Sequence, residues 1–182
     1  ADATQAYVQA RLEGKETWVL LPDECIENDE AHRHLFFDKH GNRLFKQPCV
    51  QLIKALYGHP DAGSCWERHC DAHVRQLGFQ PIENWPSCYY HEYYRAVLSN
   101  YLDEFKLASP QNEHEDKWII LDNSGLILEK HTSLGHYLGC AHDCITIPAS
   151  DDGPGAPTRR AIVYSAEPLL NKALKNYIDL AT

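Results

Sequence analysis

The chain has 182 residues, of which 26 are acidic and 17 basic, carries a net charge of −9, and contains no methionine. Its length and ordinary globular composition predict one folded domain. No apolar run reaches the roughly 18 to 20 residues of a membrane span, and the acidic net charge disfavours nucleic-acid binding. The missing methionine predicts either loss of the initiator with a processed segment or, as we favour, an internal piece of a longer polyprotein. Seven cysteines without a secretion signal predict reduced thiols and an intracellular location.

The N-terminal part of the chain predicts two extended segments and a loop. Residues 1–10 and 17–21 are rich in apolar, aromatic or β-branched side chains, which are typical of strands or strand edges. Residues 23–41 are acidic and irregular, so we expect a surface loop there.

The central part predicts one helix and one hairpin. Residues 62–77 place apolar side chains at steps of three and four and are followed by Gly78, which predicts an amphipathic helix with a glycine just past its end. Residues 88–109 are dense in aromatic and aliphatic side chains without helical spacing, and they predict a β-hairpin.

The C-terminal part predicts shorter elements. We expect a helix over 113–121, a loop over 151–157, a strand over 160–164 and a helix over 167–180. Strands, one helix, a hairpin and then a strand and helix indicate an α+β fold rather than a parallel βαβ array.

Two adjacent carboxylates, Asp103 and Glu104, interrupt the otherwise apolar stretch 101–105. Like charges in such a place resist burial unless a cation neutralises them. A divalent cation is the natural partner, and carboxylate oxygens favour Mg²⁺ or Mn²⁺. The alternative is that both residues are exposed at the tip of a hairpin.

Five short motifs occur in one order along the whole chain. They are Asp2-x-x-x-Ala6-Tyr7, then Leu56-Tyr57-Gly58-His59-Pro60-Asp61-Ala62-Gly63 with Trp66, then Leu77-Gly78-Phe79, then Tyr101-Leu102-Asp103-Glu104, and then Leu138-Gly139. In this order and spacing the chain resembles the copia-type retrotransposon reverse transcriptases, which are RNA-directed DNA polymerases.

The resemblance implies a polymerase palm, an antiparallel sheet that carries the catalytic carboxylates and has helices packed on one face. Residues 1–150 would form this domain without the basic fingers segment that precedes it in the family. Residues 151–182 would continue the same domain as a loop, a strand and a helix.

The resemblance also assigns a site. Asp2 and Asp103 match metal-binding aspartates of the family, and with Glu104 they would hold two Mg²⁺ ions, with Mn²⁺ as a substitute, for nucleotidyl transfer. Tyr7 matches the aromatic residue beneath the sugar of the incoming nucleotide. The implied partners are an RNA or DNA primer-template, deoxynucleoside triphosphates and the remainder of the polyprotein, with no membrane.

The sequence departs from the family at the second acid of the hairpin motif. Glu104 stands where the family has an aspartate, so its carboxylate reaches one methylene further into a site whose geometry must hold within about 0.5 Å. The alternative function is therefore a catalytically decayed copy of such an element.

Another alternative is a zinc-stabilised intracellular interaction domain. Cys65, His69 and His73 recur at every fourth residue of the predicted helix, and Cys140, His142 and Cys144 alternate along a predicted strand. Cys and His are the usual ligands of Zn²⁺, although neither group has the Cys-x2-Cys spacing of common zinc modules.

Overall fold

A computed structural model describes residues 1–110, 114–148 and 158–181. These residues form an α+β structure in which all three sheets are antiparallel. The chain divides into two compact units, one made of Ala1–Thr4 with His73–Thr182 and the other of Gln5–Ala72. The longest helix of the central part, α4 (Ala62–Gln76), continues from the second unit into the first.

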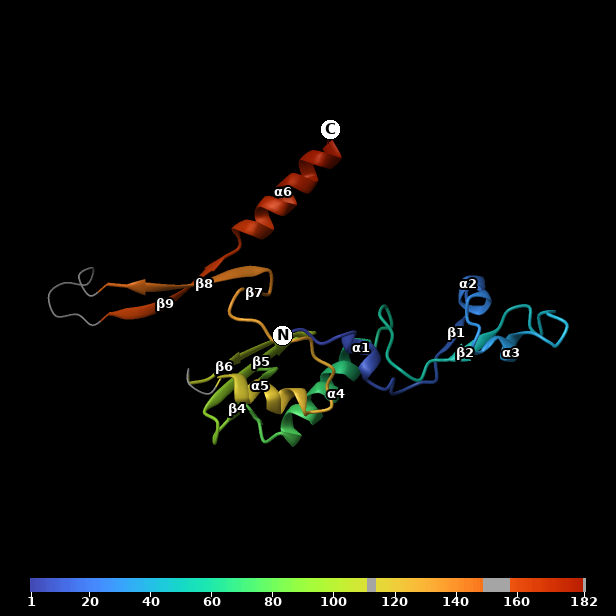
Figure 1. The fold of residues 1–182 in the computed structure, drawn as a ribbon, viewed down its shortest axis with the longest axis horizontal. Coiled ribbons are helices and arrows are strands. Elements are labelled where there is room, and N and C mark those ends of the chain that lie inside the picture. The colour runs from blue at the N-terminus through green and yellow to red at the C-terminus, as the bar shows by residue number, and fades with distance from the viewer. Residues whose placement is uncertain (111–113, 149–157, 182) are drawn as a thin grey trace. The chain divides into compact units, whose positions relative to one another are not determined.

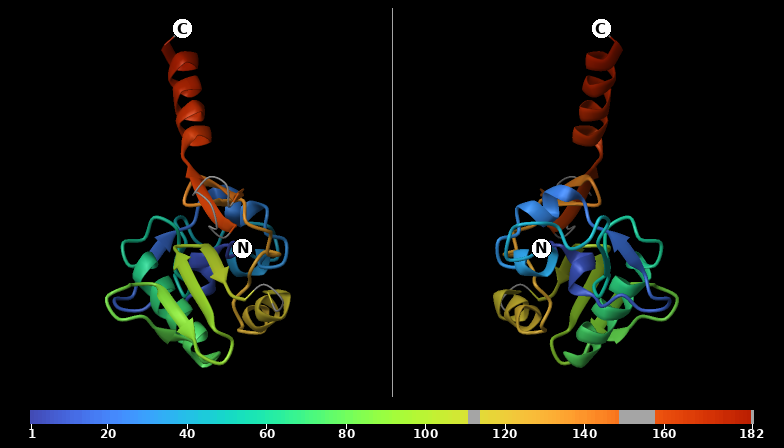
Figure 2. Two further views of the ribbon diagram at one scale, coloured as in Figure 1. Left: turned by 90° about the vertical axis from the view of Figure 1, so that its left-hand side faces the viewer. Right: turned by 90° about the vertical axis from the view of Figure 1, so that its right-hand side faces the viewer.

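The first unit is built on a four-stranded sheet in the order β3-β4-β5-β6 (Figures 1 and 2). Its strands are β3 (Gln80–Pro81), β4 (Cys88–His91), β5 (Ala96–Tyr101) and β6 (Glu104–Ala108). Alternate residues of β5 and β6 are buried, including Leu98, Phe105 and Leu107, so one face of the sheet belongs to the core. The predicted hairpin over 88–109 is thus a three-stranded meander with two turns.

A second sheet of this unit has the order β7-β8-β9. Its strands are β7 (His136–Tyr137), β8 (Cys140–Ile147) and β9 (Arg159–Ser165), and the unit also contains helices α5 (His114–Asp122) and α6 (Glu167–Ala181). The expected strand over 160–164 and the helices over 113–121 and 167–180 are confirmed within one or two residues where they are described. The expected loop over 151–157 lies outside the described residues.

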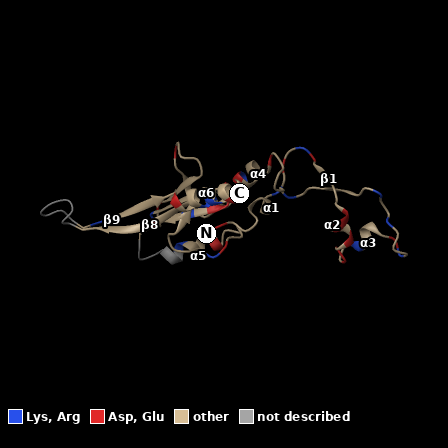
Figure 3. Ribbon diagram, turned by 90° about the horizontal axis from the view of Figure 1, so that it is seen from above, with Lys and Arg blue, Asp and Glu red and all other residues tan. Residues whose placement is uncertain are grey.

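The second unit consists of short elements. They are α1 (Ala6–Gln9), β1 (Trp18–Leu20), α2 (Asp23–Glu27), α3 (Arg33–Phe36) and β2 (Cys49–Gln51), with β1 and β2 paired. Acidic residues colour much of the α2 ribbon red in Figure 3. Two of them, Asp23 and Glu27, each accept a 2.6 Å hydrogen bond from the Arg43 guanidinium. This shared ion pair links α2 to the segment after α3.

Two of the sequence expectations are wrong in part. The expected extended segment over 1–10 is extended only at its start, because Gln5 has a left-handed φ of 49° that turns the chain into the helix α1. The expected loop over 23–41 contains α2 and α3, since Pro22 ahead of Asp23 and Glu24 supplies a rigid start and negative charge at the helix N-terminus. No helix among the described residues has both the length and the apolar character of a membrane-spanning segment.

Neighbouring residues of β5 offer a direct test of this core. Leu98 is fully buried, whereas Val97 points to the other face and is 40% exposed. We expect Leu98→Ala to lower the free energy of unfolding by about 2–5 kcal/mol, because it leaves a cavity, and Val97→Ala to lower it by less than about 1 kcal/mol. Urea titration followed by circular dichroism would measure both, and equal losses would contradict this packing.

Candidate active site

The turn between β5 and β6 carries the Tyr-Leu-Asp-Glu motif. Tyr101 pairs with Glu104, so Leu102 and Asp103 form a two-residue turn in which Leu102 adopts a left-handed φ of 55°. Asp103 is exposed at the tip, and Glu104 is half-buried as the first residue of β6. The two adjacent acids therefore have different surroundings.

Asp2 lies on the segment that extends the sheet beyond β6. The Ala3 N–H donates to the Asp103 carbonyl oxygen and the Phe105 N–H donates to the Ala1 carbonyl oxygen, both at 2.7 Å. Asp2 and Glu104 are therefore directly opposite each other as a non-hydrogen-bonded pair of antiparallel strands. In such a pair the Cα atoms lie about 4.5 Å apart and the two side chains are on the same face of the sheet. Two acids from opposite parts of the chain thus become cross-strand neighbours.

The opposite edge of this segment is paired as well. The Glu129 N–H donates to the Asp2 carbonyl oxygen at 2.7 Å, and Ala3 forms an isolated bridge with Leu128. Hydrogen bonds on both edges fix the backbone of Asp2 and Ala3, and Ala3 is buried. The position of Asp2 is therefore set by the sheet rather than by its side chain.

An open pocket of about 510 Å³ lies at the tip of the hairpin. It is lined by Tyr101, Leu102, Asp103, Glu104, Leu138 and Gly139. The last two residues form the turn between β7 and β8, and the Leu138 N–H donates a 2.7 Å hydrogen bond to Oε2 of Glu104. The sequence motifs at 101–104 and 138–139 therefore meet around one pocket.

Lys106 of β6 sits among aromatic rings of the second sheet. Its Nζ lies 5.1 Å from the ring centre of Tyr137, 5.2 Å from that of Tyr164 and 3.2 Å from Nδ1 of His142. His142 is buried, and this burial lowers the pKa of its imidazole. The positive charge of Lys106 lowers the same pKa further, by a smaller amount. Because a lysine ammonium can only donate, His142 accepts this hydrogen bond at an unprotonated Nδ1.

Tyr137 provides another tie between the two sheets. Its hydroxyl lies 2.9 Å from Oγ of Ser99 on β5, and burial raises the pKa of the phenol. Lys106 and Tyr137 were not among the residues singled out from the sequence. Their roles arise from contacts between strands far apart in the chain, for which the sequence has no periodic signal.

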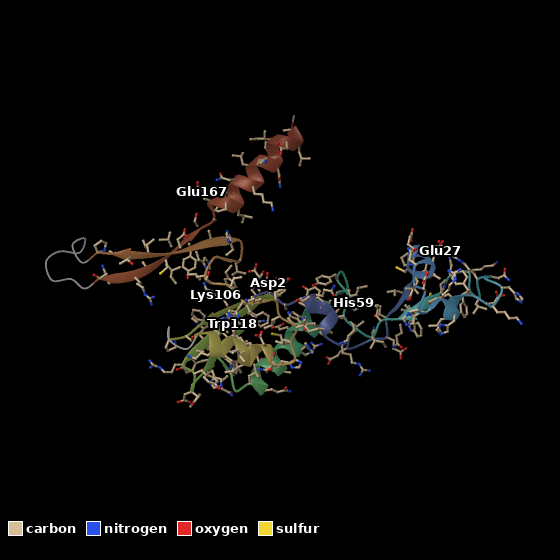
Figure 4. All side chains as sticks on the ribbon, in the orientation of Figure 1. Asp2, Glu27, His59, Lys106, Trp118 and Glu167 are labelled. Carbon is tan, nitrogen blue, oxygen red and sulfur yellow. The ribbon has the colours of Figure 1, made fainter. Side chains whose placement is uncertain are left out.

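A smaller pocket of about 270 Å³ adjoins the same lysine. Residues of β6, α5 and the segment before β8 line it, including Lys106 and Trp118, which Figure 4 labels. The ring of Trp118 stacks on that of His131 with centres 5.3 Å apart and planes 2° from parallel. This pocket has an aromatic wall and one cationic side chain.

Tyr7 belongs to the other unit, where it lies on helix α1 rather than on the expected strand. Its ring packs against the exposed Tyr57 with centres 4.5 Å apart and planes 34° from parallel. Of the two aromatic rings, Tyr7 is half-buried and Tyr57 is the more exposed.

The groups of Cys and His that suggested zinc are engaged in packing and hydrogen bonding. On α4, Cys65 is buried, the His69 ring packs on Trp66, and His73 Nδ1 lies 2.9 Å from the Ser124 carbonyl oxygen. On β8, Cys144 is exposed while His142 contacts Lys106. Across residues 1–110, 114–148 and 158–181, no three His, Cys, Asp or Glu side chains are grouped as a metal site would require.

Comparisons of the chain with protein-family models, with curated proteins and with solved structures found no match.

The buried His142 predicts a specific pH dependence of stability. Because the folded state lowers its imidazole pKa below the usual value of 6.5, the unfolded chain binds the proton more readily, and stability is lost as the pH falls below about 6.5 towards the folded pKa. The groups facing it are Lys106, His136, Tyr137 and Tyr164.

We expect His142→Gln to flatten this part of the curve of unfolding free energy against pH. His34→Gln, which replaces an exposed histidine of α3, is the matched control. Urea titrations at a series of pH values would measure the slopes. Identical slopes in the wild type and His142→Gln would refute the assignment.

Proposed function

We propose that the chain is the reverse transcriptase domain of a copia-type retrotransposon polyprotein and catalyses two-metal nucleotidyl transfer with a palm-like sheet. The observation that carries the proposal is the pairing of Asp2 with the strand that begins at Glu104. The resemblance assigns a shared site to acids far apart in the sequence, and the sheet pairs Asp2 with Glu104, which lines an open pocket together with Asp103.

The acids at this edge suit a hard divalent cation. Asp2 and Glu104 are like charges in directly opposed cross-strand positions, an arrangement that destabilises a sheet. Mg²⁺ is usually held by one or two carboxylates, water and substrate phosphates rather than by a closed cage of side chains. In the proposed site Asp2 and Asp103 would supply such carboxylates.

The residues of the chain would act by binding and orienting. Asp2 and Asp103 would hold Mg²⁺ or Mn²⁺ at the sheet edge. When bound, the cations supply activation of the primer 3′ hydroxyl and neutralisation of the leaving pyrophosphate. The proposed partners are a primer-template, deoxynucleoside triphosphates and the rest of the polyprotein.

Primer extension tests this function directly. We expect the protein to extend a DNA primer on an RNA template with Mg²⁺, and Asp103→Asn to reduce the rate by about 10²-fold or more, because the cation loses a carboxylate ligand. Asp122→Asn, at the exposed end of α5, should retain the wild-type rate. Extension by Asp103→Asn at the wild-type rate would contradict the proposal.

A stability measurement tests the cation independently of catalysis. Without divalent cations, Asp2→Asn should raise the free energy of unfolding by about 0.2–1 kcal/mol, since it removes one of two opposed like charges. The wild type should gain stability when Mg²⁺ is added, whereas Asp2→Asn should not. Thermal unfolding with and without Mg²⁺ gives both values, and an equal Mg²⁺ effect in the two proteins would argue against a site at Asp2.

A catalytically decayed copy of the same element is a second candidate function. It is favoured by the hydrogen bond between Glu104 and the Leu138 N–H, which engages an oxygen that the family's aspartate would offer to the cation. If Glu104 is the change that inactivated the copy, Glu104→Asp should extend a primer and the natural sequence should not. Extension by the natural sequence would exclude decay.

A further inference from the structure

The turn between β7 and β8 has an unfavourable backbone conformation. Tyr137 pairs with Cys140, so Leu138 and Gly139 form a two-residue turn, with left-handed φ angles of 54° and 73°. Turns with two such angles favour Asn-Gly, and a left-handed conformation costs a side chain such as leucine about 1–2 kcal/mol. Strain of this kind persists only where surrounding contacts hold it.

Space around Gly139 is also restricted. A Cβ at this residue would lie 3.4 Å from Cδ2 of Leu169 on α6. The turn thus lies next to α6 on one side, and on the side of the pocket its Leu138 N–H donates to the Glu104 carboxylate. Glu104 is the one residue of β6 that is hydrogen-bonded to this turn among the contacts described.

The length of the Glu104 side chain matters for this contact. Oε2 lies 2.7 Å from the Leu138 nitrogen, and a charged acceptor makes a hydrogen bond roughly twice as strong as a neutral one. An aspartate is shorter by one C–C bond of about 1.5 Å, which would place its oxygen beyond the usual limit of about 3.2 Å for such a bond. The family's aspartate could not make this contact without movement of the turn.

We infer that Glu104 is a positioning residue, which holds the β7–β8 turn against the β5–β6 turn and so forms the wall of the pocket beside Asp103. This inference rests on the proposed function for the identity of the site, and it leaves cation binding there to Asp2 and Asp103. Two further contacts, Ser99 with Tyr137 and Lys106 with His142, join the same two sheets near this turn.

Replacement of Glu104 by Gln, Asp and Ala tests the inference, with the exchange rate of the Leu138 amide proton measured by NMR on protein labelled at leucine. Glu104→Gln keeps the reach and an acceptor oxygen, so the rate should stay within about threefold of the wild type. Glu104→Asp and Glu104→Ala lose the contact and should exchange several-fold faster. An unchanged rate in Glu104→Ala would overturn the inference.

Titration with Mn²⁺ followed by calorimetry supplies the second readout. Glu104→Gln should bind Mn²⁺ within about twofold of the wild type, whereas Asp103→Asn should bind it at least tenfold more weakly. An equal loss in Glu104→Gln would make Glu104 a metal ligand and overturn the inference. No Mn²⁺ binding by the wild type would refute the proposed function, and the Leu138 exchange rates would still decide the role of Glu104.

Discussion

The antiparallel pairing of the first residues with the start of β6 is the constraint on which the site depends. Backbone hydrogen bonds from Ala3 to Asp103 and from Phe105 to Ala1 fix the register, and a shift by one residue would send Asp2 to the other face of the sheet. The pairing is weakened by electrostatic repulsion, because it places the carboxylate of Asp2 opposite that of Glu104. Such an arrangement is expected where function, rather than stability, selects the residues.

The second sheet matters because it completes the pocket. Its β7–β8 turn reaches the β5–β6 turn, and three polar contacts join the strands around it: Glu104 with Leu138, Ser99 with Tyr137, and Lys106 with His142. These contacts combine a carboxylate, a phenol and a cation among aromatic rings. Glu104 and Lys106 belong to β6 and Ser99 to β5, so these contacts reach the second sheet from two neighbouring strands.

The spacing of apolar residues predicted the longer helices and strands. The helix α4 follows from the spacing of its apolar residues and from Gly78, which has a φ of 94° just beyond it. The strand β9 and the helix α6 were likewise predicted. The short helices α1 and α2 were missed because one or two turns give too few residues for a period to show, and their starts depend on single residues such as Gln5 and Pro22.

The sequence by itself determined the chemical types at the candidate site: adjacent acids at 103 and 104, a remote acid at position 2, and a Leu-Gly pair at 138–139. Only the tertiary structure decided which of them meet. Asp2 lies opposite Glu104 because strand pairing is non-local, and the carboxylate of Glu104 contacts a backbone N–H, a donor that every residue except proline carries. Because nearly every residue offers this donor, the sequence does not indicate which one Glu104 contacts.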